Sequence, residues 1–183
     1  KELYRNQQKP AQTRPMFMRY AIAATILALM AVGAIFLLQK PADPQALFAD
    51  AYTLPSAPEQ LSISKSDSIT IDSLKREAFA NYNSRDFAKA ETQLESLLQF
   101  PDLEAPDDAR FYLGISQLEQ GNTSKAIATF SQMAKNLEGA QWYTALAYLK
   151  AGDIEKAKEK LTAITADPEH FYVGKARSLL EKL

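Results

Sequence analysis

The stretch GISQLEQGNTSKAIATFSQM, residues 114–133, decides the fold, because two other stretches of the chain align with it without gaps. They are AFANYNSRDFAKAETQLESL, residues 78–97, and ALAYLKAGDIEKAKEKLTAI, residues 145–164. Self-similarity at a spacing of about 20 to 50 residues is typical of proteins that stack one supersecondary unit on the next. The sequence therefore predicts a repeat architecture across these residues.

The three copies share residue types at matching positions. A small residue opens each copy, and an aromatic residue or leucine follows it. A polar turn comes next, then an alanine, then two large apolar residues. These positions are Ala78, Gly114 and Ala145; Tyr82, Leu118 and Leu149; Arg85-Asp86, Gly121-Asn122 and Gly152-Asp153; Ala90, Ala126 and Ala157; Leu94, Phe130 and Leu161; Leu97, Met133 and Ile164.

The shared pattern predicts a helical hairpin in each copy. Apolar residues spaced three and four apart give a helix one buried stripe. The Gly, Asp and Asn residues of the turn are suited to end the first helix and to cap the second. Small residues allow the two helices to approach closely. The expected fold class is all-α, a short solenoid of stacked hairpins.

The pattern resembles the tetratricopeptide repeat family over about residues 71–167. Ala90, Ala126 and Ala157 are 36 and then 31 residues apart, which brackets the family's period of about 34. The expected domain is 71–183, with repeats at 71–103, 106–136 and 138–167. A capping helix is expected at 170–183, because its apolar residues share one face and a repeat array needs a closing element.

The chain departs from the family pattern at two kinds of position. The tryptophan of the first helix is replaced by Leu74, Arg110 and Gln141, although Trp142 follows one place later. The proline after the second helix survives only approximately, as Pro101 and Pro168.

The resemblance implies a concave face built from the first helices, which would receive a peptide or a partner helix. The alternative is that these side chains are core, or are covered by the preceding linker or by the capping helix. The candidate groove residues are Phe79, Tyr82, Asn83, Phe111, Ile115, Leu118, Glu119, Trp142, Leu146, Leu149 and Lys150.

Residues 20–38, YAIAATILALMAVGAIFLL, carry no charge. Ala21 to Leu38 would form about 27 Å of helix, close to the roughly 30 Å of a bilayer core. We expect a single transmembrane helix there, in contact with the lipid bilayer. A cleavable signal peptide and a buried core helix are the alternatives, but the residues after Leu38 make a poor cleavage site.

Flanking charge predicts the orientation of this span. Lys9, Arg14 and Arg19 lie close before it, and only Lys40 lies close after it. The positive-inside rule then places the N-terminus in the cytoplasm and the repeat domain in the periplasm or another extracytoplasmic space, with the span in the inner membrane. The sequence is typical of a bacterial envelope protein with this layout.

The segments around the span complete the expected organisation. Residues 1–19 form a basic tail, and the chain opens on Lys1 rather than Met, which leaves room for residues before it. The basic residues of the tail are spread out with few aromatics, so no nucleic-acid partner is expected. Residues 39–70 are rich in Pro, Ser and Asp, and predict a mostly extended linker with one short helix from Pro44 to Tyr52.

No catalytic constellation is present in the sequence. The chain has no cysteine, which excludes disulfides and thiolate metal sites. The single histidine, His170, is expected in an exposed loop, and Asp107 and Asp108 are expected to favour a helix N-terminus rather than to hold a metal. Phosphate-binding loops and the HExxH and GxSxG motifs are missing. We therefore expect no enzyme, cofactor or metal.

The resemblance and the layout together imply a function. The first hypothesis is a membrane-anchored scaffold for protein–protein interaction, or an assembly or chaperone-like accessory, whose partner is another protein or peptide. The alternative is a transmembrane signalling regulator, similar in layout to membrane-bound anti-sigma regulators, with the repeats as an extracytoplasmic sensor.

Overall fold

The computed structural model describes Met30 and residues 43–58, 69–134 and 137–183. The expected basic tail, and the expected transmembrane helix apart from Met30, lie outside these residues. Within the described parts, no helix is long and apolar enough to cross a bilayer. The compact unit treated below runs from Ala42 to Leu183.

The described residues are helical, and no strand occurs among them, which confirms the all-α prediction. The helices are α2 (Pro44–Ala51), α3 (Ile69–Asn83), α4 (Phe87–Leu97), α5 (Pro106–Glu119), α6 (Thr123–Ser131), α7 (Glu138–Lys150), α8 (Ile154–Thr165) and α9 (Val173–Leu180).

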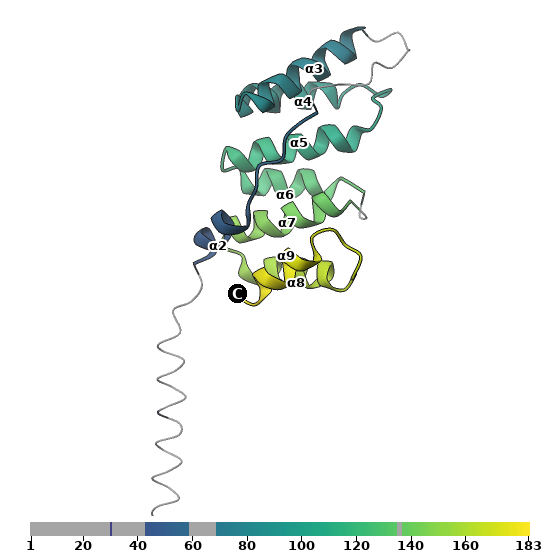
Figure 1. Cartoon of the computed structure of the whole chain (residues 1–183). Coiled ribbons are helices and arrows are strands. Elements are labelled where there is room, and N and C mark those ends of the chain that lie inside the picture. The colour runs from purple at the N-terminus through teal and green to yellow at the C-terminus, as the bar shows by residue number, and fades with distance from the viewer. Residues whose placement is uncertain (1–29, 31–42, 59–68, 135–136) are drawn as a thin grey trace, which may run out of the picture. The chain divides into compact units, whose positions relative to one another are not determined.

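Helices α3 to α8 form three antiparallel hairpins, one for each sequence copy. The hairpins are α3–α4, α5–α6 and α7–α8, and each packs mainly against the next in order (Figure 1). Helix α9 packs on α8 and closes the stack. Contacts made mostly between sequence neighbours are the property that defines a solenoid.

The turns of the three hairpins have the predicted chemistry except at Asn122, whose side chain makes no capping hydrogen bond to α6. Arg85, Gly121 and Gly152 adopt positive φ angles of 64°, 80° and 79°, which end each first helix in the left-handed region. Asp86 and Asp153 cap the second helices, because their carboxylates accept backbone N–H groups three residues on at 3.3 and 3.1 Å. Arg85 fills a position where glycine is favoured.

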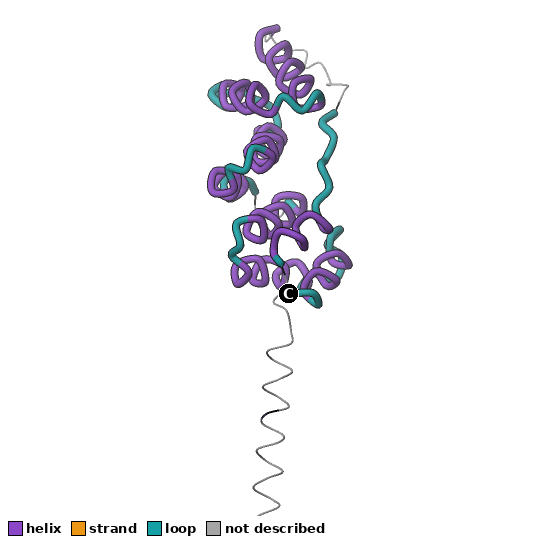
Figure 2. Tube along the Cα trace, turned by 90° about the vertical axis from the view of Figure 1, so that its left-hand side faces the viewer, coloured by secondary structure: helices purple, strands orange, loops and turns teal. Residues whose placement is uncertain are grey.

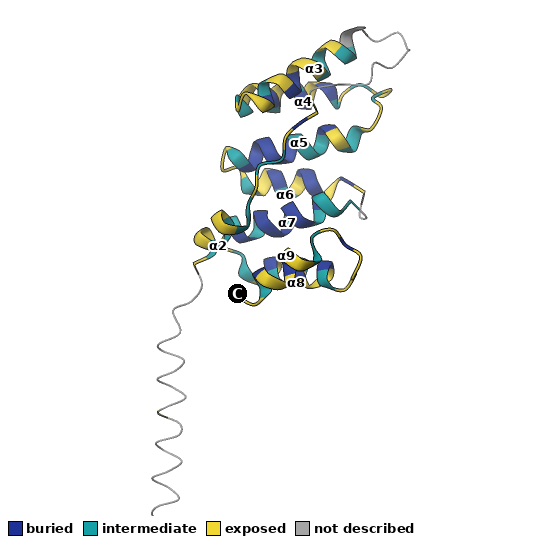
Figure 3. Cartoon of the chain, in the orientation of Figure 1, coloured by how far each residue is buried: buried dark blue, intermediate teal, exposed yellow. Residues whose placement is uncertain are grey.

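The repeated small and apolar residues form the core, as the alignment predicts. Gly114 must be glycine because a Cβ there would run into the ring of Phe130 on the partner helix. The other aligned core residues are all buried, and most are fully so (Figure 3). They are Ala78, Tyr82, Ala90, Leu94, Leu97, Leu118, Ala126, Met133, Ala145, Leu149, Ala157, Leu161 and Ile164.

The capping helix is shorter than predicted, since α9 begins at Val173 and ends at Leu180. His170 lies just before this helix and is 4% exposed rather than solvent-exposed as expected. Its Nε2 lies 2.8 Å from Gln141 Oε1, and its Nδ1 accepts the backbone N–H of Tyr172 at 3.1 Å. This bond occupies the Tyr172 N–H, and the regular helix starts one residue later.

Residues 43–58, which fall within the predicted linker, pack on the helical stack. We call them the strap: they consist of α2, which packs on α7 and α9, and the extended stretch Tyr52–Pro58. Figure 2 shows this stretch running along one side of the helical stack. The prediction of a short helix at Pro44–Tyr52 is confirmed by α2. The linker predicted at residues 39–70 is therefore packed against the helices over residues 43–58.

Candidate partner-binding groove

The strap lies on a surface formed by the first helices α3, α5 and α7, which we call the first-helix face. Each of these helices contributes a tyrosine whose hydroxyl donates a hydrogen bond to a strap carbonyl. Tyr143 Oη donates to Thr53 O at 2.6 Å. The other two bonds are Tyr82 Oη to Pro55 O at 2.6 Å and Tyr112 Oη to Ser56 O at 3.1 Å.

The side-chain amide of Asn83 both accepts a hydrogen bond from the strap and donates one to it. Its Oδ1 accepts the backbone N–H of Ala57 at 3.0 Å, and its Nδ2 donates to the carbonyl of the same residue at 3.1 Å. Ala57 is only 4% exposed, and it is the one buried residue between positions 43 and 58. The first-helix face therefore forms hydrogen bonds with the backbone of an extended chain. This chain runs from α7 towards α3, opposite to the order of the repeats.

Helix α2 is attached to the end of α7 and to the C-terminal residues. Gln45 Nε2 donates to Lys150 O at 2.6 Å, and the Lys150 ammonium lies 4.9 Å from the Phe48 ring centroid. Lys150 Nζ also donates to Leu118 O at 2.7 Å, which links α7 to α5. The exposed ion pair between Asp50 and Lys182, 2.6 Å apart, adds little to stability.

Aromatic rings of the strap and of the helices beneath it form a continuous ladder. Phe48 stacks on Tyr52 at 4.9 Å between centroids, and Tyr52 meets Tyr143 edge-on at 5.9 Å. The ladder continues through Phe111 and Tyr112, 5.3 Å apart. Its further steps are Tyr143–Phe111, Tyr112–Tyr82 and Tyr82–Phe87, at 5.4, 5.0 and 5.7 Å. Edge-to-face pairs of this kind are favourable beyond their area burial.

Burial raises the pKa of Tyr52, Tyr82, Tyr112 and Tyr143, which keeps their hydroxyls protonated at neutral pH. Tyr52 differs from the others because its buried hydroxyl completes no hydrogen bond with any described residue. The carboxylate of Glu119 approaches this hydroxyl and, after burial, raises its pKa further. Glu119 thus places a negative charge close to the first-helix face.

The predicted groove residues divide into two groups. Tyr82, Asn83, Glu119 and Lys150 contact or approach the strap, and the ring of Phe111 supports the tyrosines. The remaining six are buried within the stack: Phe79, Ile115, Leu118, Trp142, Leu146 and Leu149.

Trp142 belongs to the buried group for a specific reason. It is 1% exposed, and its ring stacks on Tyr172 at 5.2 Å between centroids with an interplanar angle of 1°. The residues that lead into α9 therefore cover Trp142, whereas the strap covers Tyr82 and its neighbours.

Tyr112 and Tyr143 also bind the strap, although the sequence analysis does not place them in the groove. Each lies one position after an aromatic residue assigned to the groove, Phe111 and Trp142 respectively. Neighbouring positions on a helix point about 100° apart, so each pair presents two different directions. The adjacent aromatic pairs, FY at 111–112 and WY at 142–143, were the sequence signal that could have indicated these two tyrosines.

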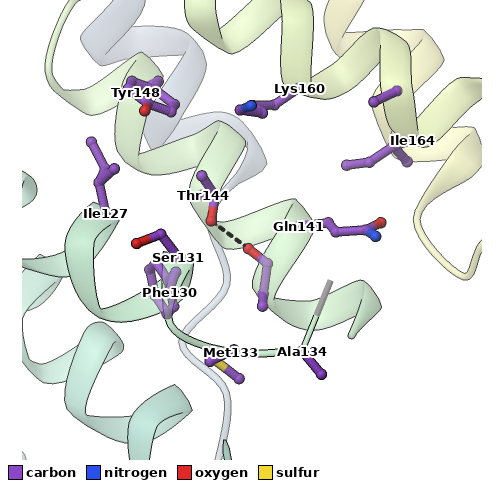
Figure 4. A pocket seen from close by; sticks show the side chains of 12 residues that line it. Ile127, Phe130, Ser131, Met133, Ala134, Gln141, Thr144, Tyr148, Lys160 and Ile164 are labelled. Carbon is purple, nitrogen blue, oxygen red and sulfur yellow. Dashed lines mark hydrogen bonds between the residues drawn. The ribbon is translucent and has the colours of Figure 1, made fainter. Parts of the chain in front are cut away.

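A separate cavity of about 460 Å³ lies between α6 and α8 with α7 as its floor (Figure 4). Its lining is mainly apolar, including Ile127, Phe130 and Ile164. The Thr144 hydroxyl is turned to the carbonyl of Ala140 at 2.7 Å rather than into the cavity. Among the described residues, no cluster of His, Asp or Glu could hold a metal ion. The cavity thus offers space without reactive chemistry.

Comparison with known proteins relates part of the chain to a family. No curated protein and no solved structure matches the chain. The sequence model of the tetratricopeptide repeat family matches residues 108–136 and 140–169, which contain most of the α5–α6 hairpin and the α7–α8 hairpin. These two matches support the assignment of residues 108–169 to the tetratricopeptide repeat family.

Proposed function

We propose that this chain is a membrane-anchored scaffold that binds a segment of another protein on the first-helix face of its repeat domain. Tetratricopeptide repeats suggest a protein-interaction role in general. The observation that carries the proposal is that the face already binds an extended polypeptide, the strap, through side chains of α3, α5 and α7.

The chemistry of the face suits a peptide better than a small molecule. Its tyrosine hydroxyls and the Asn83 amide are spaced along the backbone of several consecutive residues, from Thr53 to Ala57. Main-chain hydrogen bonds supply affinity in peptide recognition, while neighbouring side-chain sites supply selectivity. The aromatic ladder provides the apolar surface on which such a peptide packs.

The membrane anchor is part of the proposal because residues 20–38 are uncharged and long enough to cross a bilayer. The basic residues before them favour a cytoplasmic N-terminus. In this arrangement the scaffold works in the periplasm or another extracytoplasmic space, attached to the inner membrane. External protease added to intact spheroplasts should then digest the repeat domain, whereas protection of the domain would reverse the orientation.

A photo-crosslinking experiment tests the scaffold function. A photoreactive amino acid replaces Glu119, on the first-helix face, or Glu155, an exposed residue of α8, in the full chain in native membranes. The matched glutamates differ in location rather than in chemistry. We expect Glu119 to give a discrete adduct with another protein and Glu155 to give none.

The signalling alternative has one observation in its favour. The strap follows the predicted span closely in sequence and occupies the first-helix face, so a partner that displaces it would change how residues 43–58 are held. In that case, partner binding outside the membrane should alter the protease sensitivity of residues 1–19 in sealed vesicles. An unchanged digestion pattern would leave the scaffold as the better assignment.

A further inference from the structure

We propose that residues 52–58 are a built-in competitor for the first-helix face, and that the external partner is an extended, proline-containing peptide segment that binds in their place. This inference rests on the proposed function, because it names the partner class for that face and the event that controls access to it.

The contacts of the strap explain why another peptide could replace it. All the hydrogen bonds from Tyr82, Asn83, Tyr112 and Tyr143 to the strap go to main-chain atoms. A backbone is common to every peptide, so these bonds do not select for the sequence of the strap itself. They require only an extended chain whose carbonyls lie at the same spacing.

The strap also shows which side chains the face accepts. The residue beside Asn83 must be small, because Ala57 is buried, and it must carry a backbone N–H, which excludes proline there. Pro55 and Pro58 have no N–H, and their positions therefore tolerate proline. Prolines favour the extended backbone and lower the entropy lost on binding. The partner chemistry is therefore an extended segment with prolines that flank a small residue.

Much of the strap is exposed, whereas the surface that it covers is buried. No residue of α2 is buried, and Thr53, Ser56 and Pro58 are exposed. By contrast, Tyr82 beneath the strap is 1% exposed. Departure of the strap would remove Ala57 and the half-buried Tyr52 and Leu54 from the core and would expose the aromatic rings of the first-helix face. An open face is thus unfavourable, and replacement by a second peptide is the expected outcome.

The covalent connection between the strap and α3 favours the state in which the strap occupies the first-helix face of the isolated protein. Only residues 59–68 separate the strap from α3, whose Tyr82 and Asn83 it contacts. A short connection gives the strap a high effective concentration at the face. The same argument favours the chain's own strap over that of a second copy.

The test uses the full chain in detergent micelles and a fluorescein-labelled synthetic peptide with the sequence of residues 43–58. Fluorescence anisotropy measures the affinity of the wild type, Ala57→Glu and Ser56→Glu for this probe. A glutamate does not fit the buried Ala57 site, whereas Ser56 is exposed and controls for charge. Ala57→Glu should bind the probe at least about tenfold more tightly than the wild type, since its face is open. Ser56→Glu should match the wild type.

A second set of variants locates the probe on the face. Adding Tyr82→Phe and Tyr143→Phe to the Ala57→Glu chain removes the hydroxyls that bind Pro55 O and Thr53 O. The probe should then bind about tenfold more weakly. If Ala57→Glu loses its helical circular dichroism, Ala57→Pro, which removes the backbone N–H that Asn83 Oδ1 accepts, replaces it and should also tighten binding.

Equal affinity of the wild type and the opened variants would overturn the competitor role, as would binding that ignores the tyrosine changes. A wild-type dimer that the probe dissociates would instead assign the strap to a second copy, which also overturns the inference. If probe exchange fails while Glu119 still crosslinks to a protein, only this inference fails. If exchange succeeds and the crosslink is absent, the scaffold function fails.

Discussion

Asn83 and Ala57 form a reciprocal hydrogen-bonded pair, in which the side-chain amide of Asn83 both accepts from and donates to the backbone of Ala57, at 3.0 and 3.1 Å. The pair lies at the end of the strap and joins it to α3. It makes residues 43–58 part of the domain rather than a spacer.

Replacing Asn83 by alanine should loosen this end of the strap. The change leaves the N–H and C=O of Ala57 without their partners, which costs about 1–3 kcal/mol for buried polar groups. The free energy of unfolding in urea should fall by that amount, and protease should cleave between residues 52 and 58 more quickly. Ser84→Ala, at an exposed neighbour, should change stability by less than about 0.5 kcal/mol. Equal effects of the two changes would contradict the role of the pair.

The buried tyrosines predict a loss of stability in alkaline solution. Burial raises the pKa of Tyr52, Tyr82 and Tyr143 above the value of 10.0 for a free side chain. The contribution of these tyrosines to the free energy of unfolding is therefore fully present below about pH 10. It is lost as the pH rises beyond that value, because the tyrosines of the unfolded chain ionise first. Urea unfolding at about pH 8 and about pH 11 measures the difference. Tyr82→Phe combined with Tyr143→Phe should reduce this dependence, and an unchanged slope would contradict the assignment.

Trp142→Ala should destabilise the whole domain rather than weaken partner binding alone. Trp142 is almost fully buried and stacks on Tyr172, so the cavity left behind should cost about 3–5 kcal/mol. Thermal unfolding followed by circular dichroism measures this loss. A variant that keeps wild-type stability but loses partner binding would return Trp142 to the groove.

His170→Ala should lower stability through the entry to α9. The ring bridges the Gln141 side chain and the Tyr172 backbone. Its removal takes one hydrogen-bond partner from each of these two half-buried residues. The expected cost is about 1–3 kcal/mol, measured by urea unfolding. Phe171→Ala is the control, because Phe171 is 77% exposed and should change stability by less than about 0.5 kcal/mol.

The sequence predicts the helical stack well because its determinants are local and repeated. The glycines Gly121 and Gly152 indicate a left-handed turn conformation. The alanine that follows each turn indicates close packing of the two helices. Three copies of the pattern reinforce one another. The family model matches two of the three hairpins, and the α3–α4 hairpin has the same geometry although its turn carries Arg85 in place of glycine.

The strap could not be predicted in the same way. Its stretch from Tyr52 to Pro58 has neither helical nor strand periodicity, and Pro and Ser are typical of linkers. Most of its attachment uses main-chain atoms, which every sequence has. His170 was missed for a similar reason, since its burial depends on a long-range partner, Gln141. Contacts between distant residues leave no mark on the local pattern.

A matched pair of glycines tests the turn geometry. Gly152 has a φ of +79°, which a side chain rarely adopts, so Gly152→Ala should destabilise the domain by about 1 kcal/mol although no atom lies within 4 Å of the added Cβ. Gly174 lies inside α9 with helical backbone and equally free space, so Gly174→Ala should stabilise it by up to about 1 kcal/mol. Urea unfolding of both variants measures the opposite signs. Because both added methyl groups meet open space, the difference isolates backbone conformation from packing, and changes of the same sign would contradict the left-handed turn at Gly152.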